Sequence, residues 1–319
     1  MGRRLLIIRF SAIGDLLLTA PVLQCLASCG HDLTLVVKRS HKSAAEVLPG
    51  VDEQLIWEDA QAGLIEHGKG RYDAVIDLQG TYQSKQFTRK LGLPVSTFHK
   101  PYLKRWLLLI TKSPSFKISP VVERYAHAAS PWMEGRSLPT KLSFKLAENG
   151  SIKNALVFVI GGTQVGKRLS LIQWQELISN IAFDGNPMVL LGGPDDQKLA
   201  HELCAQFDHL IDATSYSIAS GLSLIKNAAL VVSGDTGFMH AASLLDTPLV
   251  SFWGATHPNL GFAPWPVRSS QKEVMSKSIW TPMSKHGKKL IFLPNPMNKL
   301  PVSEVLTAIE QMLQDRTTP

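Results

Sequence analysis

The chain has little cysteine, no long uncharged apolar run and no low-complexity tract. Its three cysteines, Cys25, Cys29 and Cys204, match no metal-ligand spacing and exclude a disulfide-stapled miniprotein. A reduced compartment, hence the cytosol, is the simplest expectation for such a chain. Because Arg9 and Asp15 interrupt the first apolar stretch, we predict neither a signal peptide nor a membrane-spanning helix there.

The composition is that of a globular protein with a sizeable core. Of 319 residues, 45% are hydrophobic and 18% are charged, which excludes a disordered chain or a coiled coil and suggests two domains. Residues 1–150 hold 20 Lys and Arg against 13 Asp and Glu, whereas residues 151–319 hold 13 of each. The excess is densest in 100–124, which is either a solvated helix face or a patch for an anionic partner such as nucleic acid, a phosphorylated substrate or an acidic membrane.

Short apolar runs alternate with helical patterns, which predicts an α/β protein with parallel sheets. Predicted strands cover residues 5–10, 33–37, 54–57, 74–78, 95–98, 156–160, 188–191, 210–211, 230–233 and 249–252. Predicted helices cover 15–28, 60–67, 84–91, 171–183, 195–207, 218–227, 238–245 and 302–313, with Ser170 and Asp195 as N-caps. Asn149-Gly150-Ser151 is the strongest breaker. We therefore predict two doubly wound domains, 1–150 and 151–319, with ligands at the carboxyl ends of the strands.

The turn after the first predicted strand carries an isolated carboxylate. Its sequence is Arg9-Phe10-Ser11-Ala12-Ile13-Gly14-Asp15. Gly14 allows a tight turn, and the amides of the first helical turn make the site electropositive. Asp15 is therefore either a helix-start charge or a general base aimed into a cleft. The three-glycine dinucleotide pattern is absent.

The second half places polar turns after four of its predicted strands. Gly161-Gly162-Thr163 followed by Lys167 suits a phosphate, although the lysine lacks the Ser or Thr that follows it in a Walker A loop. Gly192-Gly193-Pro194-Asp195 suits a nucleobase or ribose, and Gly234-Asp235-Thr236-Gly237, with His240 one turn on, suits a diphosphate. Gly254-Ala255-Thr256 follows the last predicted strand. Each turn also fits a purely structural role, and their order is the stronger evidence.

In this order the motifs resemble those of bacterial ADP-heptose:lipopolysaccharide heptosyltransferases, glycosyltransferase family nine. The resemblance covers residues 9–21, 161–167, 191–196, 234–240 and 254–256. The chain departs from the family pattern at Ala255, where Pro is frequent, and at Gly234, where Asn is common. Residues 280–289 lack the cysteines that relatives often carry there.

The resemblance implies a GT-B fold, with two Rossmann-like domains and a central cleft. The first domain would bind the acceptor and the second the ADP-sugar, with the helix at 302–313 packing back on the first domain. The reaction would be inverting, with no metal and no cofactor, because ADP-heptose is a substrate. Asp15 would deprotonate the acceptor hydroxyl, and Lys167 would neutralise the leaving diphosphate. The other implied donor-binding residues are Gly162, Thr163, Asp195, Asp235, Thr236, Gly237 and His240.

The expected acceptor is an anionic Kdo- or heptose-bearing lipid A core. Ser11, Lys100, Lys104 and Arg105 are the predicted acceptor-binding residues, and segment 100–124 would contact the cytoplasmic face of the inner membrane. Two other interpretations stay open: a GT-B sugar-nucleotide epimerase, and a catalytically idle nucleotide-sugar-binding protein. A nucleic-acid partner is not expected, because the chain shows no base-stacking or groove-reading module.

Overall fold

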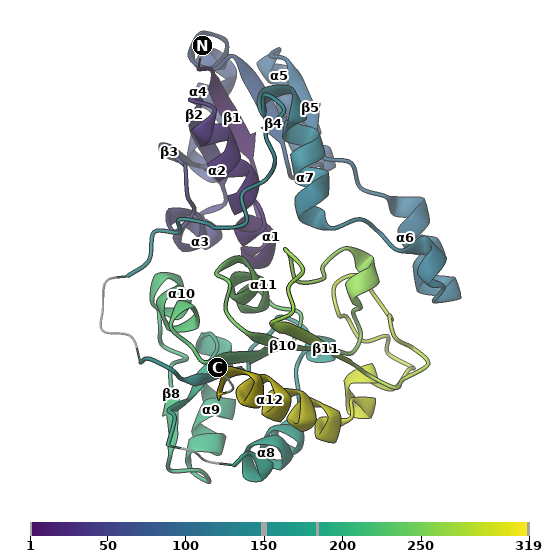
Figure 1. Ribbon diagram of the computed structural model, residues 1–319. Helices are drawn as coiled ribbons and strands as arrows, with labels where there is room; N and C mark the ends of the chain where they lie inside the picture. Colours follow the sequence, from purple (N-terminus) through teal and green to yellow (C-terminus); the bar gives the residue numbers. More distant parts are fainter. Residues whose placement is uncertain (1, 148–151, 183–184, 318–319) are drawn as a thin grey trace. The chain divides into compact units, whose positions relative to one another are not determined.

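The computed structural model describes residues 2–147, 152–182 and 185–317 (Figure 1). Contacts divide the chain into two compact units, Met1–Tyr102 with Ser119–Lys145, and Leu103–Ile118 with Leu146–Pro319. The first unit thus ends at Lys145, whereas the sequence predicts a boundary at residue 150. The predicted breaker Asn149-Gly150-Ser151 lies outside the described residues.

The first unit is built on a five-stranded parallel sheet of order β3-β2-β1-β4-β5. Its strands are β1 (Arg4–Ile8), β2 (Asp32–Val37), β3 (Glu53–Ile56), β4 (Ala74–Asp77) and β5 (Val95–Thr97). All five predicted strands of this half are confirmed to within two residues. The central strands β1, β2 and β4 are apolar runs buried on both faces, as expected of a parallel sheet covered by helices.

The helices of the first unit differ from the predicted ones at three places, one of which is a short helix at Lys42–Glu46 that was not predicted. They are α1 (Ile13–Leu17), α2 (Ala20–Ser28), α3 (Lys42–Glu46), α4 (Trp57–Arg71), α5 (Tyr82–Leu91) and α7 (Val121–Ala129). The single helix predicted over 15–28 is broken, because Pro21 has no N–H and fits only the first turn of α2. Helix α7 was not predicted, although its buried residues 121, 122, 125, 128 and 129 follow a helical stripe. The Ser- and Pro-rich residues before it hide that signal.

The second unit is built on a six-stranded parallel sheet of order β11-β10-β9-β6-β7-β8. Its strands are β6 (Leu156–Val159), β7 (Met188–Leu191), β8 (Leu210–Asp212), β9 (Leu230–Ser233), β10 (Leu249–Trp253) and β11 (Gln271–Met275). Read in chain order from β6, this is the Rossmann strand order 3-2-1-4-5-6. The five predicted strands are confirmed, and β11 was missed because it is a mostly polar edge strand paired with β10 alone.

The helices of the second unit are α6 (Tyr102–Thr111, assigned here from Leu103), α8 (Leu171–Asn180), α9 (Gln197–Cys204), α10 (Ile218–Lys226), α11 (Gly237–Leu244) and α12 (Val302–Thr317). Helices α9, α11 and α12 pack directly on strands of the sheet. Trp174 on α8 is fully buried, with ring centroids 5.8 Å from Phe158 and 6.0 Å from Phe252. Helix α12 packs against α8 and against strands β9, β10 and β11 of its own unit.

The predicted N-caps have opposite outcomes. Ser170 caps α8 in a reciprocal capping box with Gln173, as predicted. Asp195 is not a cap, because a short 3₁₀ turn, Pro194–Asp196, precedes α9 and places Asp196 at the cap position.

Each sheet has one topological switch point, which is the place where the chain leaves two adjacent strands toward opposite faces of the sheet. It falls between β1 and β4 in the first unit and between β6 and β9 in the second. Open α/β sheets bind ligands outside the carboxyl ends of these strands. Asp15 follows β1, Lys167 follows β6 and Asp235 follows β9, so the fold places the predicted residues at these positions.

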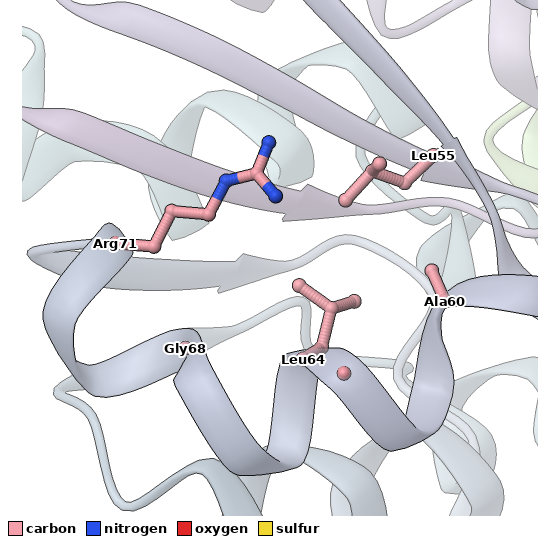
Figure 2. Close-up of a pocket in the computed structure, with 6 residues that line it drawn as sticks. Leu55, Ala60, Leu64, Gly68 and Arg71 are labelled. Carbon is pink, nitrogen blue, oxygen red and sulfur yellow. The ribbon is translucent and has the colours of Figure 1, made fainter.

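A cavity of about 260 Å³ lies elsewhere in the first unit, between α4 and strand β3. Figure 2 shows Leu64 of α4 and Leu55 of β3 pointing toward one another across it. Arg71, which also lines the cavity, is held by Glu53 at 2.5 Å. All of the lining residues belong to β3 or α4. Among the described residues, no helix is long and apolar enough to cross a membrane.

Candidate active site

The carboxylate of Asp15 is held at the start of α1 by two side chains that come from other elements. The guanidinium of Arg9, which is almost fully buried, forms an ion pair with Asp15 Oδ2. Arg9 Nη1 also donates a 2.8 Å hydrogen bond to the carbonyl of Leu78, after β4. The hydroxyl of Tyr125 on α7 lies 3.5 Å from Asp15 Oδ1 and donates toward it. The Asp15 side chain is 25% exposed, so an oriented carboxylate faces solvent.

Tyr125 keeps its proton under all ordinary conditions. Complete burial raises the pKa of its hydroxyl, and the negative charge of Asp15 raises it further, whereas Arg9 acts in the opposite direction. The hydroxyl is therefore a permanent hydrogen-bond donor to Asp15. No sequence motif indicates this contact, because 110 residues separate Tyr125 from Asp15.

A second buried carboxylate organises the neighbouring turn. Asp77 at the end of β4 accepts hydrogen bonds from the amides of Gln79 and Gly80 at 3.0 and 2.9 Å, and from the hydroxyl of Ser84 at 2.9 Å. Burial raises the pKa of Asp77, although these donors and the charge of Lys100 lower it. The Gln79 side chain in turn accepts a hydrogen bond from the amide of Phe10 at 3.1 Å. The turns after β1 and β4 are thus tied together.

Two of the predicted acceptor-binding residues lie at this switch point. Ser11 is half-buried in the turn between β1 and α1. Lys100 lies beside the turn after β4, since a Cβ built on Gly80 would be 3.6 Å from Lys100 Cε.

The other two, Lys104 and Arg105, lie on α6, which contacts assign to the second unit. This differs from the predicted domain 1–150. The physical reason is a pair of contacts with distant parts of the chain: Lys112 Nζ donates to the carbonyl of Pro282, and the amide of Ile118 donates to the carbonyl of Asn259 at 2.8 Å.

In the second unit, Lys167 and Asp235 meet at the switch point between β6 and β9. Lys167 Nζ lies 2.8 Å from Asp235 Oδ2, and the Asp235 side chain is almost fully buried. His240, on the first turn of α11, places Nε2 3.8 Å from the other Asp235 oxygen. The sequence predicted these three residues as site residues, and the structure brings them together.

The loop after β6 passes close to the turns around it. Thr163 is exposed on this loop, and Gly162 precedes it. A Cβ on Gly234 would lie 2.2 Å from the carbonyl oxygen of Lys167. The backbone of Lys167 can therefore approach this turn only because position 234, which departs from the family pattern, is a glycine.

Thr236 caps α11 by accepting a hydrogen bond from the Met239 amide at 3.2 Å. Gly237 follows as the first residue of that helix. The amides at the start of α11 make the turn electropositive, as at other helix N-termini that bind anions.

The structure places the predicted donor-binding residue Asp195 and its neighbour Asp196 in different surroundings. Asp195 is exposed on the 3₁₀ turn. Asp196 is buried, accepts a hydrogen bond from the Gly193 amide at 2.9 Å, and lies 3.5 Å from Arg168 Nη1. A Cβ on Gly161 would come within 2.4 Å of Asp196 Oδ2. Nothing in a pair of adjacent aspartates signals which one turns inward.

The segment that lacks cysteines is anchored by hydrogen bonds. The amides of Met283 and Ser284 donate to the carbonyl of Ala255 at 2.9 and 3.0 Å, and the Ala255 amide donates to Gly166 at 2.9 Å. A proline at position 255 would lack that last bond. Gly287, with φ of +77°, packs so closely on Lys167 that a Cβ there would lie 2.5 Å from Lys167 Cγ. The segment therefore buries the stem of Lys167 and leaves its ammonium group beside Asp235.

Among the residues that the structure describes, no group of three or more His, Cys, Asp or Glu side chains could hold a metal ion. Positive charge at the second switch point comes from Lys167, from Arg168 and from the start of α11.

Comparison with known proteins gives a consistent result. The model of glycosyltransferase family 9 (heptosyltransferase) matches residues 66–290. Lipopolysaccharide heptosyltransferase 1 of Pseudomonas aeruginosa is 25% identical over 283 residues, which cover 80% of this chain and 79% of that protein.

Two solved Escherichia coli structures share the fold. ADP-heptose lps heptosyltransferase II has a TM-score of 0.71 at 19% identity, covering 98% of this chain and 99% of that one. Heptosyltransferase WaaC with ADP has a TM-score of 0.68 at 22% identity, covering 97% and 99%. These likenesses confirm the predicted GT-B fold.

Proposed function

Because the chain belongs to glycosyltransferase family 9, we propose that it transfers a heptose from ADP-heptose to the anionic inner core of a lipopolysaccharide acceptor. The observation that carries this proposal is the cluster of Lys167, Asp235, His240 and the start of α11 at one switch point. The names of the relatives support the choice of a nucleotide-heptose donor and of a lipopolysaccharide acceptor.

Lys167 is the residue proposed to carry the leaving-group charge. Transfer breaks the bond between the anomeric carbon of the heptose and the diphosphate oxygen, and the electron pair leaves with ADP. An ammonium group has three donors, so Lys167 can hold a diphosphate oxygen while it keeps Asp235. Thr163 and Gly162 on the same loop, together with the amides of Thr236 and Gly237, complete the phosphate contacts. In this proposal no metal ion is needed.

Asp235 is proposed to position rather than to bind phosphate. A second anion beside the diphosphate would repel it, whereas a carboxylate already paired with Lys167 fixes the direction of the ammonium group. His240 lies within reach of the same turn and is proposed to donate to a phosphate or sugar oxygen. Asp195, exposed on the turn after β7, is proposed to contact the adenosine end.

Asp15 is proposed to be the general base. It would take the proton of the acceptor hydroxyl as that oxygen bonds to the anomeric carbon, on the face opposite the departing ADP, which inverts the configuration. Arg9 and Tyr125 leave the carboxylate a single orientation. Ser11 and Lys100, at the same switch point, are proposed to hold the anionic acceptor. Because that acceptor is anchored in lipid, we place the protein at the cytoplasmic surface of the inner membrane.

Calorimetric titration with ADP and UDP, without added metal and with EDTA, tests the donor site. We expect ADP to bind and UDP to bind at least tenfold more weakly, with ADP binding reduced in Lys167→Ala. Preference for UDP would move the assignment to another transferase or to an epimerase, and binding of neither would contradict the donor site.

A transfer assay tests the base. We expect Asp15→Asn to lower turnover by about 10²–10⁴-fold while ADP affinity stays unchanged. Asp208→Asn, a fully exposed carboxylate in the second unit, serves as the matched control. Near-normal turnover of Asp15→Asn would refute the assignment of Asp15.

A further inference from the structure

Two segments of the second unit present large apolar side chains to solvent. The first is α6, which exposes Leu103, Trp106 and Ile110. Their spacing of three and four residues places them on one face of the helix, while Leu108 is buried. The second is residues 276–293, where Ile291 and Phe292 are 86% and 94% exposed. Such side chains are rarely left together on the surface of a protein that has no partner there.

The two segments are held to the same body. Lys112, just after α6, donates through Nζ to the carbonyl of Pro282 and, at 2.5 Å, to that of Leu109. Ser284 and Met283 are fixed to Ala255 through their amides. We refer to α6 together with residues 276–293 as the basic apolar face. Its exposed large apolar side chains are Leu103, Trp106, Ile110, Ile279, Trp280, Leu290, Ile291 and Phe292.

The charge of this face has one sign. Helix α6 and residues 276–293 contain six lysines and arginines and no aspartate or glutamate. One of these lysines, Lys277, forms an ion pair at 2.6 Å with Glu304, a residue of α12 that lies outside the face. Lys288 and Lys289 are exposed and directly precede the apolar run Leu290–Phe292. Lys104 is exposed on α6 beside Leu103.

We propose that the basic apolar face docks on an anionic lipid bilayer, with Leu290–Phe292 and the Leu103–Ile110 face of α6 inserted at the headgroup level. Apolar side chains flanked by lysines are the chemistry that binds such an interface, because the chains enter the acyl boundary while the charges attract anionic headgroups. This inference rests on the proposed function, because an enzyme whose acceptor is anchored in lipid must reach that acceptor from the membrane surface.

A second copy of the chain fits this face less well. A twofold dimer would bring the same patch of each copy together, and therefore set lysines against lysines. An anionic bilayer supplies the opposite charge and an apolar layer at once. The lipid surface is therefore the occupant that matches both properties of the face.

Sedimentation of the full chain with vesicles tests the proposal. We expect binding to phosphatidylglycerol–phosphatidylethanolamine vesicles that is at least about tenfold tighter than to phosphatidylcholine vesicles, and that weakens as salt rises. Ile291→Ser with Phe292→Ser should lower binding to anionic vesicles by about tenfold or more. Lys288→Glu with Lys289→Glu should lower it too and reduce its salt dependence. Val267→Ser, which is equally exposed in the same unit but outside the face, should bind like the parent protein.

Equal binding to both vesicle types, no binding, or unchanged binding of the Ile291 and Phe292 variant would each overturn the proposal. Self-association that the same variant abolishes, without vesicle binding, would assign the face to a second copy instead. ADP affinity and transfer to a deacylated, water-soluble acceptor should be unchanged in both double variants. If the parent protein binds anionic vesicles but does not bind ADP, the proposed function is refuted while the docking proposal stands.

Discussion

The ion pair between Lys167 and Asp235 permits a prediction that separates stability from catalysis. The Asp235 side chain is 4% exposed and its Oδ2 lies 2.8 Å from Lys167 Nζ. Lys167→Met keeps most of the stem that packs under Gly287 but removes the ammonium group. Removing one partner of a buried pair leaves an uncompensated charge and costs about 3–5 kcal/mol. Because Lys167 is 18% exposed and His240 lies nearby, we expect a cost below this range, about 2–3 kcal/mol.

The second variant, Asp235→Asn, relieves that cost. The double variant Lys167→Met with Asp235→Asn should unfold with a free energy about 1–2 kcal/mol higher than Lys167→Met alone, since no buried carboxylate is left unpaired. Transfer should stay about 10²–10³-fold below the parent rate in the double variant, because the diphosphate has lost its cation.

Urea unfolding of the parent and three variants, followed by fluorescence, measures the coupling energy, and a transfer assay measures turnover. Lys198→Met, an exposed lysine on α9, is the control for loss of one positive charge. A Lys167→Met protein as stable as the parent would refute the structural part of the reasoning. A double variant that regains parental turnover would refute the catalytic part.

Three further predictions concern other parts of the molecule. Tyr125→Phe should lower kcat about 3- to 10-fold with ADP affinity unchanged, because Asp15 loses one orienting donor; an unchanged kcat and pH profile in steady-state transfer would contradict this. Gly287→Ala should weaken ADP binding in calorimetry, because φ of +77° is strained for alanine and its Cβ would displace Lys167. Burial lowers the pKa of His257 below its ordinary 6.5. Just below pH 6.5 the imidazole is therefore protonated more often in the unfolded chain than in the folded one. The free energy of unfolding should therefore fall as pH drops below about 6.5, by less in His257→Asn, and urea midpoints at about pH 7.5 and 5.5 measure the difference.

Local sequence determined most of the secondary structure. Ten of the eleven strands were predicted, and the central ones, such as β1, β6 and β9, are buried runs of mainly aliphatic residues. The edge strand β11 was missed because Gln271, Lys272 and Glu273 carry no such pattern. The motifs after the first, sixth and ninth strands also indicated Asp15, Lys167 and Asp235, since turns at the carboxyl ends of parallel strands meet at one edge of a sheet.

Tertiary structure alone decided which groups surround those residues. Arg9 and Tyr125 reach Asp15 from a strand end and from a helix 110 positions away, and no local pattern records that contact. Asp196 rather than Asp195 turns inward because the 3₁₀ turn places it over Gly161 and Gly193. Helix α6 joins the second unit through Lys112 and Ile118, although it follows the first unit in the chain. Local sequence thus determined where strands and turns form, whereas side-chain partners and unit membership depend on long-range packing that only the folded chain provides.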